Sequence, residues 1–284
     1  MRLLVLGHGY SAGFLAALLK AEGWQITGTT RSQPERVLAS GATPLLWPGD
    51  EDAVRDEIAR ADAILVSAGP QEGHDPALAA FGPDIARTRA RWIGYLSTTG
   101  VYGDHGGDWI DEETPLSPTT RRGHDRVTAE QAWQALAAAH ALPLHIFRLA
   151  GIYGPGRGPF AKLRAGTARR IVKPGQVFSR IHAEDIAQAL LASIKAPRPG
   201  AIYNLCDDDP APPEDVIAHA ATLLGLAPPP AEDFASAEMT PMARSFYAES
   251  KRVSNERIKR ELGVRLKYPD YRSGLAALLA EGGD

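Results

Sequence analysis

Short apolar runs alternate with helical stretches along the first half of the chain, and this alternation constrains the fold more than any other feature. Runs with strand character cover residues 2–6, 25–30, 43–47, 63–67, 91–97 and 144–149. Helical spacing covers residues 10–20, 51–60 and 128–140 between them. Strands and helices in this order form βαβ units, and strands that are apolar throughout are typical of a parallel sheet covered on both faces. We therefore predict an α/β fold with a Rossmann-like, doubly wound parallel sheet.

A glycine turn, Gly7-His-Gly-Tyr-Ser-Ala12, follows the first strand and opens the first helix. It matches G-x-G-x-x-[G/A], the dinucleotide-binding fingerprint, in which the first glycine permits a tight turn and the second lets the pyrophosphate approach the backbone. The helix N-terminus adds unpaired N–H groups that favour phosphate. The predicted cofactor contacts are Gly7, Gly9, Tyr10, Ser11 and Ala12. The alternative is a turn that only packs the helix on the strand.

The same stretch also spells G-x-S-x-G, from Gly9 to Gly13, which is the nucleophile-elbow pattern of serine hydrolases. In that interpretation Ser11 is the nucleophile. An elbow needs earlier strands to supply an oxyanion loop, and only a single short strand precedes Gly9. A hydrolase is therefore a minor alternative.

The end of the second strand indicates which dinucleotide is preferred. NAD-binding proteins usually place Asp or Glu there to bind the ribose 2′-hydroxyl. This strand ends in Thr30-Arg31-Ser32, without an acid. Arg31 can form charge-assisted hydrogen bonds with a 2′-phosphate, so NADP(H) is favoured over NAD(H), with Thr30 and Ser32 beside it. The alternative is an exposed loop arginine.

The second half of the chain is richer in glycine and proline and less regular, although a helix over residues 183–194 is expected to return to the sheet. We predict a dinucleotide-binding domain formed by residues 1–152 and 183–205. Residues 153–182 and 206–284 are predicted to form a smaller, irregular substrate lobe.

Four further motifs carry a family resemblance. They are Ser97-Thr-Thr-Gly-Val-Tyr-Gly103, Glu112-Glu-Thr-Pro-Leu-Ser-Pro118, Arg148-Leu-Ala-Gly-Ile-Tyr-Gly-Pro-Gly156 and Arg180-Ile-His-Ala-Glu-Asp185. With the glycine turn, they make nearly the whole chain resemble the extended short-chain dehydrogenase/reductase superfamily, in its NAD-dependent epimerase/dehydratase group. The resemblance implies a Rossmann-like domain that binds NAD(P), a small lobe that covers the substrate, and Thr98 at the position of the catalytic Ser/Thr.

The chain departs from this family at the catalytic base, which is the tyrosine of Y-x-x-x-K. The spacing to Glu130 places Arg122 at the tyrosine position and Arg126 at the lysine position, and no lysine lies within residues 21–161. Arginine cannot transfer protons near neutral pH, because its pKa exceeds about 12. We expect Arg126 to contact the nicotinamide ribose. For Arg122, a role in the site and a solvated charge on the helix surface both stay open.

Another group must then move the proton if the chain is an enzyme. Histidine has a suitable unperturbed pKa, and tyrosines stand in two of the motifs. The predicted catalytic residues are Thr98, Tyr102, His124, Arg126 and Tyr153, with His105 and Asp125 as further candidates. The literal Y-x-x-x-K at Tyr247–Lys251 is interpreted as a coincidence.

The resemblance and the rule that ligands bind at strand carboxyl ends supply the remaining cofactor contacts. They are Ser67, Ala68 and Gly69 after the fourth strand, Ser97 in the fifth, Arg126, and Leu149, Gly151 and Ile152 after the sixth. No metal is expected, because acids at the start of a helix, such as Glu184 and Asp185, are favoured by the helix dipole alone.

Composition excludes several kinds of partner. The formal net charge is −3, which favours neither nucleic acid nor an anionic membrane. The single cysteine, Cys206, excludes a disulfide framework, and every apolar run is too short to span a bilayer. We expect a cytoplasmic protein. The Ala-rich helix around residues 129–139 suits a homodimer as well as burial against the sheet.

Two functions are predicted from these observations. The first is an NADP(H)-binding oxidoreductase or epimerase that acts on a small carbonyl or hydroxyl compound with a non-standard active site. The second is a catalytically silent NADP(H)-binding sensor or scaffold, since the Tyr–Lys pair is absent. A titratable group near the nicotinamide and a pocket behind it would favour the enzyme.

Overall fold

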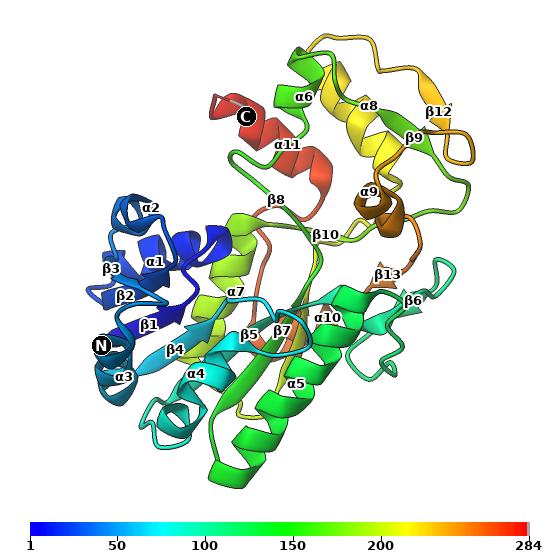
Figure 1. Ribbon diagram of the computed structural model, residues 1–284. Helices are drawn as coiled ribbons and strands as arrows, with labels where there is room; N and C mark the ends of the chain where they lie inside the picture. The colour runs from blue at the N-terminus through cyan, green and yellow to red at the C-terminus, as the bar shows by residue number, and fades with distance from the viewer. Residues whose placement is uncertain (283–284) are drawn as a thin grey trace.

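The computed structural model describes residues 1–282 and confirms the predicted α/β fold (Figure 1). Its centre is a seven-stranded sheet in the order β11-β7-β5-β4-β1-β2-β3, and all neighbouring strands are parallel. The strands are β1 (Arg2–Leu6), β2 (Gln25–Thr30), β3 (Thr43–Leu46), β4 (Ala63–Val66), β5 (Trp92–Thr98), β7 (Leu144–Leu149) and β11 (Ile202–Leu205). The winding direction reverses between β1 and β4, and ligands of such sheets bind at the carboxyl ends of the strands there.

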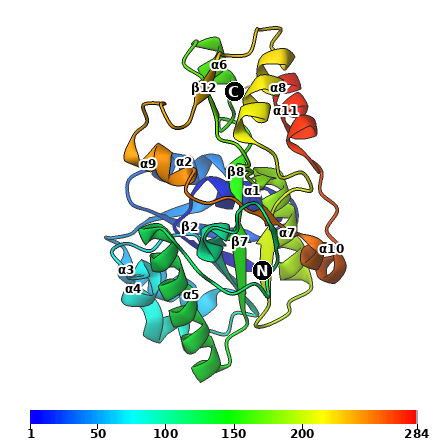
Figure 2. The same ribbon diagram turned by 90° about the vertical axis from the view of Figure 1, so that its right-hand side faces the viewer.

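Alternate strand residues feed two separate cores, one on each face of the sheet. Leu3 and Val5 belong to the core under α1 and α7, whereas Leu4 and Leu6 belong to the core under α3, α4 and α5. These helices are α1 (Tyr10–Ala21), α3 (Glu51–Arg60), α4 (Pro76–Ile85), α5 (Arg121–His140) and α7 (Ala183–Lys195). Figure 2 shows α5 and α7 on opposite sides of the sheet. Burial of both faces explains why a central strand such as β4 consists of apolar residues only.

Helix α5 begins at Arg121, seven residues before the predicted start. The side chain of Thr120 caps it by accepting a hydrogen bond from the Gly123 amide at 3.1 Å. A Cβ at Gly123 would lie 2.9 Å from the carbonyl oxygen of Gly100, so this glycine lets the helix start touch the loop after β5. The early start places Arg122 and Arg126 on the first two turns of the helix.

A smaller lobe lies above the carboxyl ends of the strands in Figure 1. Its core is formed around Phe160, Leu163 and Leu275. Its elements are α6 (Phe160–Arg164), β9 (Arg170–Val172), α8 (Pro213–Leu223), β12 (Ala231–Asp233), α9 (Pro241–Phe246) and α11 (Tyr271–Ala280). None of the helices within residues 1–282 is long and apolar enough to cross a membrane.

Several segments join the lobe to the sheet domain. Strand β8 (Gly151–Tyr153) pairs with β10 (Arg180–His182). Strand β13 (Arg252–Val253) pairs with β6 (Trp109–Ile110), and α10 (Glu256–Leu262) packs on α7 and β11. Residues 252–262 were predicted to belong to the lobe, but they pack on the sheet domain. Two further short elements, α2 (Pro34–Ala39) and the 3₁₀ helix Thr99–Tyr102, follow β2 and β5.

Candidate functional site

The glycine turn has the geometry that the fingerprint requires. Gly7 has φ +84°, and a Cβ on it would lie 2.6 Å from the backbone nitrogen of Ala68, so only glycine fits between β1 and the end of β4. Its amide donates to Thr29 Oγ1 at 2.8 Å, which fixes the turn against β2. Gly9 is the N-cap of α1, and no side chain caps that helix end. The first amides of α1 therefore have no side-chain acceptor, which leaves them free to bind an anion.

His8, between the two glycines, turns away from this site. Its ring lies against Gly28, and its Nε2 pairs with Ser40 Oγ at 2.9 Å. Burial, together with the smaller effect of the nearby Arg36 charge, lowers the pKa of His8 to about 4. His8 is thus a neutral packing residue that couples the turn to β2 and α2.

Arg36 is a cation near the turn that the sequence interpretation missed. Its charge acts on both His8 and Tyr10, so it lies close to the glycine turn. Arg31, which was predicted, is exposed at the end of β2, and the part of the chain that the structure describes offers it no partner. Thr30 Oγ1 accepts from the Gln33 amide at 3.1 Å and shapes the loop between the two arginines.

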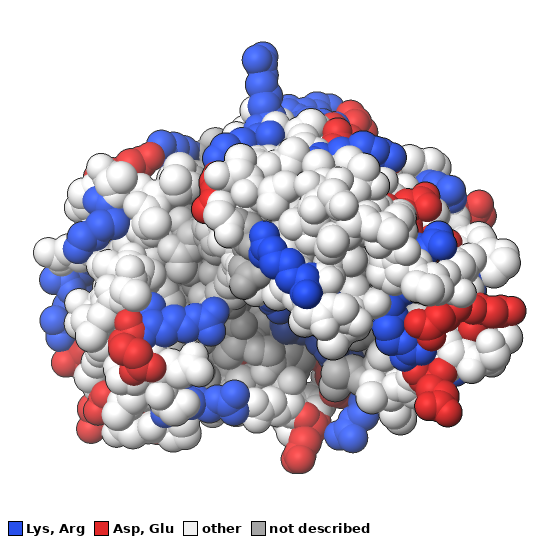
Figure 3. Space-filling view, turned by 90° about the horizontal axis from the view of Figure 1, so that it is seen from above, with Lys and Arg blue, Asp and Glu red and all other residues white. Residues whose placement is uncertain are grey.

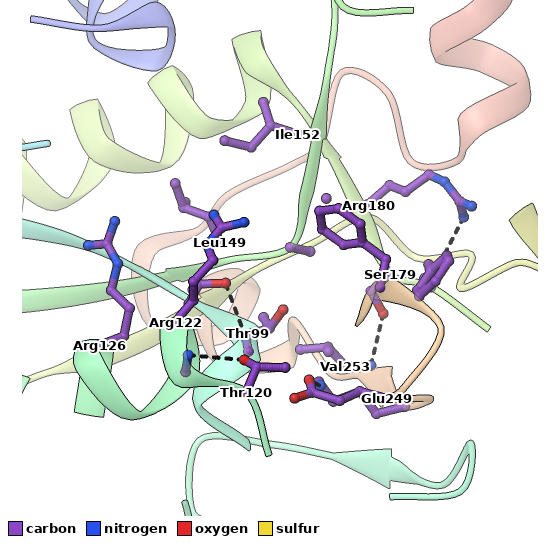
Figure 4. Close-up of a pocket in the computed structure, with 18 of the residues that line it drawn as sticks. Thr99, Thr120, Arg122, Arg126, Leu149, Ile152, Ser179, Arg180, Glu249 and Val253 are labelled. Atoms are coloured by element: carbon purple, nitrogen blue, oxygen red, sulfur yellow. Dashed lines mark hydrogen bonds and ion pairs between the residues drawn. The ribbon is translucent and has the colours of Figure 1, made fainter. Parts of the chain in front are cut away.

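A cavity of about 650 Å³ opens at the carboxyl ends of β4, β5 and β7 and extends to the smaller lobe (Figure 4). The face seen in Figure 3 is hollowed, and Lys and Arg side chains project over the hollow. The structure brings together in this cavity seven residues predicted from sequence, which are Gly69, Thr98, Arg126, Leu149, Gly151, Ile152 and Tyr153. The glycine turn, Thr30, Arg31, Ser32, Ser67 and Ala68 do not line it.

Arg126 is held at the inner end of the cavity. It donates to the carbonyl oxygen of Leu96 at 2.7 Å and to the hydroxyl of Tyr95 at 3.1 Å. Its guanidinium lies against Gly69, where a Cβ would be 3.0 Å from Nη2. Arg126 therefore joins β5 to the loop after β4, at the place where the resemblance expects a contact with the nicotinamide ribose.

Arg122 and Thr98 both face the cavity. Figure 4 shows the Arg122 side chain pointing toward Leu149, with Arg126 beside it on the same helix. Thr98 Oγ1 accepts from the Gly100 amide at 3.1 Å, which leaves its O–H free to donate to a ligand oxygen. Arg122 thus lines the cavity, and whether it acts there stays a prediction.

Ser97 and Tyr102 were predicted to lie in the site, but in the structure the side chains of both form hydrogen bonds in a buried network next to the cavity. Ser97 Oγ donates to Glu130 at 2.5 Å, and the Tyr102 hydroxyl donates to Asn204 and accepts from Arg148, both at 2.8 Å. Burial raises the pKa of Tyr102 to about 12. Tyr102 does not line the cavity, and its hydroxyl is used in these two hydrogen bonds. Its role in the structure is therefore to connect buried residues next to the cavity.

His124 and Tyr153 also differ from their predicted role. His124 is exposed on α5 and does not line the cavity, because the helix turns it away from the face that carries Arg122 and Arg126. Tyr153 lines the cavity, but its hydroxyl donates to the carbonyl oxygen of Asp270 at 3.4 Å. Burial raises the pKa of Tyr153 strongly, which disfavours its ionised form.

The cavity contains an ion pair that sequence reasoning missed. Lys251 Nζ donates to Glu249 Oε2 and to the carbonyl oxygen of Gly103, both at 2.6 Å. Glu249 Oε1 accepts from the Thr119 hydroxyl at 2.7 Å, next to the cap of α5. An ammonium group has three N–H bonds, so these two acceptors leave the third N–H available. The Y-x-x-x-K match at residues 247–251 was interpreted as a coincidence, but its lysine, Lys251, lines the cavity.

Ser11 lacks the partners of a hydrolase nucleophile. Its side chain is buried in the first turn of α1, and within residues 1–282 no histidine or carboxylate hydrogen-bonds its hydroxyl. Ser11 therefore has no base to activate it, and the hydrolase alternative fails.

The fold, the glycine turn and the cavity define a nicotinamide-dinucleotide-binding protein of Rossmann type. The model of the NAD-dependent epimerase/dehydratase family matches residues 84–206. Protein YeeZ of Escherichia coli K12 is 32% identical over 296 residues, which cover 95% of this chain and 97% of YeeZ. The chain belongs to the NAD-dependent epimerase/dehydratase family.

Solved structures agree with this assignment. A functionally unknown conserved protein from Silicibacter pomeroyi DSS superposes with a TM-score of 0.94 at 61% identity, over 99% of this chain and 98% of that one. UDP-glucuronic acid 4-epimerase from Bacillus cereus, in complex with UDP-glucuronic acid and NAD, gives a TM-score of 0.80 at 14% identity, over 98% and 97%. The second likeness shows the fold alone.

Proposed function

We propose that this protein is an NADP(H)-dependent oxidoreductase or epimerase that acts on a small carbonyl or hydroxyl compound. The observation that carries the proposal is one continuous cavity. It extends from Gly69, after β4, and Arg126, on α5, to Phe246 of the smaller lobe and to Lys251, which directly precedes β13. A substrate held by the lobe can therefore reach a nicotinamide held by the strand ends.

The residues present fit a dinucleotide. Gly7 and the uncapped start of α1 would hold the pyrophosphate, and Arg126 the nicotinamide ribose. Strand β2 ends without an acid, and Arg31 after it and Arg36 on α2 supply two positive charges, which suits the 2′-phosphate of NADP(H) better than the free 2′-hydroxyl of NAD(H).

The chemistry of the site needs a proton donor other than the missing tyrosine. When bound, the nicotinamide supplies or accepts the hydride. We assign the proton to Lys251, which gives an N–H proton to the substrate oxygen as the carbonyl becomes an alcohol and then regains one from solvent. Thr98 orients that oxygen through its free O–H, and Glu249 keeps Lys251 in place.

The cofactor assignment is tested by calorimetry with NADPH, NADP⁺, NADH and NAD⁺. We expect NADP(H) to bind more tightly, and Arg31→Ala and Arg36→Ala each to weaken that form about 10- to 150-fold, the worth of about 1.5–3 kcal/mol for a charged hydrogen bond. Binding of NAD(H) should change little. Arg87→Ala, which removes an exposed arginine paired with Asp84, is the matched control. Equal affinities for NADP⁺ and NAD⁺ would contradict the preference.

Turnover separates the enzyme from the sensor. NADPH oxidation is followed with a panel of small aldehydes, ketones and oxo acids, using wild type, Thr98→Val and Lys251→Met. The enzyme predicts turnover that both variants reduce without loss of NADPH affinity. Tight NADPH binding with no turnover across the panel would favour the alternative, a sensor or scaffold. The cytoplasmic location and the homodimer stay predictions.

A further inference from the structure

The cavity holds four cationic side chains, but three of them already have acceptors. Arg126 and Arg180 donate to backbone carbonyl oxygens, Arg180 to those of Phe178 and Ala211 at 2.9 and 3.0 Å. Lys251 is paired with Glu249. Arg122 differs from them, because its guanidinium has no hydrogen-bond or ion-pair partner among the described residues.

The charges around the cavity do not balance. Its lining carries the four cations Arg122, Arg126, Arg180 and Lys251, and only the two carboxylates Asp125 and Glu249. The excess of positive charge raises the local concentration of anions and disfavours a cationic ligand.

The remaining walls on the substrate side are largely apolar. Phe178 and Phe246 come from the smaller lobe, and Ile152, Val177 and Val253 from the segments that join it to the sheet. Phe246 is 57% exposed, so a ligand that covers it would bury apolar surface. A ligand with an apolar body and one anionic end matches this lining.

We propose that the substrate is an oxo or hydroxy acid with an apolar body, and that Arg122 binds its carboxylate. This inference rests on the proposed function and names its substrate class. A guanidinium presents a planar pair of N–H donors that fits a carboxylate in two parallel hydrogen bonds. One free guanidinium matches the single charge of a carboxylate, whereas a diphosphate would leave most of its charge without a free cation.

The direction of the Arg122 side chain indicates which carbon of the substrate reacts: the one next to the bound carboxylate. Figure 4 shows Arg122 pointing toward Leu149, on the side of the cavity where Ile152 also lies. These two residues are the expected flank of the nicotinamide. A carboxylate bound there brings the neighbouring carbonyl or hydroxyl carbon toward the hydride position and its oxygen toward Thr98. The apolar body then extends to Phe178 and Phe246.

The test is calorimetry on the protein saturated with NADP⁺, with pairs of ligands in which a neutral group replaces the carboxylate. The probes are phenylpyruvate against phenylacetone, and cinnamate against cinnamamide. We expect each acid to bind wild type at least 10-fold more tightly than its neutral partner, with a preference that falls as salt is raised. Arg122→Gln should abolish the preference, and Arg122→Lys should restore part of it. Arg121→Gln, an exposed neighbour outside the cavity lining, should keep it.

Several outcomes would overturn the proposal. They are equal binding of acids and neutral partners, no binding of any acid at millimolar concentration, and a preference that survives Arg122→Gln. The melting temperature of each variant shows that it is folded. Because NADP⁺ is titrated first, its failure to bind refutes the proposed function, whereas normal NADP⁺ binding without acid binding refutes only the substrate class.

Discussion

Removal of one member of the buried pair between Glu130 and Arg148 should destabilise the fold severely. Arg148 donates through Nη2 to Glu130 Oε2 at 2.8 Å, and the two side chains are only 4% and 1% exposed. Glu130 also accepts a hydrogen bond from the Ser97 hydroxyl, and Arg148 donates one to the Tyr102 hydroxyl. In Glu130→Leu the guanidinium would stay buried among β5, β7 and α5 with its main counter-charge gone.

The expected loss follows from the burial of the charge. Breaking a buried ion pair from one side costs about 3–5 kcal/mol, whereas replacing both partners with apolar residues is often nearly neutral. Glu130→Leu should therefore lower the melting temperature by roughly 6–20 °C, at about 2–4 °C per kcal/mol for a chain of this size. The double variant Glu130→Leu/Arg148→Met should recover most of the loss.

The assay is urea unfolding followed by tryptophan fluorescence, with thermal melting beside it. The matched control is Glu22→Gln, which breaks the exposed pair with Lys195, 37% and 57% exposed, and should cost no more than about 1 kcal/mol. Two results would refute this reasoning. The first is that Glu130→Leu lowers the free energy of unfolding no more than the control does. The second is that the double variant is as unstable as the single one, since the loss would then not come from the unpaired charge of Arg148.

Three further predictions follow from contacts around the site. Burial raises the pKa of Asp207 from 3.8 to about 8, and Arg180 opposes this, so the folded state holds a proton that the unfolded state releases. Stability should fall between pH 4 and pH 8 by up to about 1.4 kcal/mol per pH unit, and Asp207→Asn should flatten this slope in urea titrations at stepped pH. Gly28→Ala would place a Cβ 2.4 Å from the His8 ring and should cost about 1–3 kcal/mol, which His8→Ala should relieve in a double-mutant cycle. Tyr102→Phe should cost about 1–3 kcal/mol by leaving buried polar groups unsatisfied, yet leave the Kd for NADP⁺ unchanged if its role is only structural.

The sheet could be predicted closely because its strands are buried on both faces. Continuous apolar runs such as residues 63–66 leave little choice of structure, and the bounds of β1, β2 and β7 are as predicted. The start of α5 was missed because Gly123 and the charged residues around it have no apolar period. The helix begins there through the Thr120 cap and the close contact of Gly123 with Gly100, which are tertiary features.

The cofactor turn was predictable because its chemistry is local. Gly7, Gly9 and the start of α1 are neighbours in sequence, and the resemblance locates Arg122 and Arg126 by counting from Glu130. The buried hydrogen bond of the Tyr102 hydroxyl could not be predicted, because its partner Asn204 is 102 residues away in the sequence. Lys251 was dismissed for the same reason, since nothing local indicates that it contacts Gly103.

The route by which Lys251 reaches the cavity has a consequence for catalysis. The residue directly precedes β13, and β13 pairs with β6 of the sheet domain, so the lysine is held from the sheet side. Glu249, its partner, bonds Thr119 beside the cap of α5, and α5 carries Arg122 and Arg126. Arg122 and Arg126 are therefore linked to Lys251 through the start of α5. A loss of the Thr119–Glu249 bond should accordingly change the position of Lys251 and of Arg122 together, and under the roles proposed for them it would couple proton delivery to recognition of the substrate carboxylate.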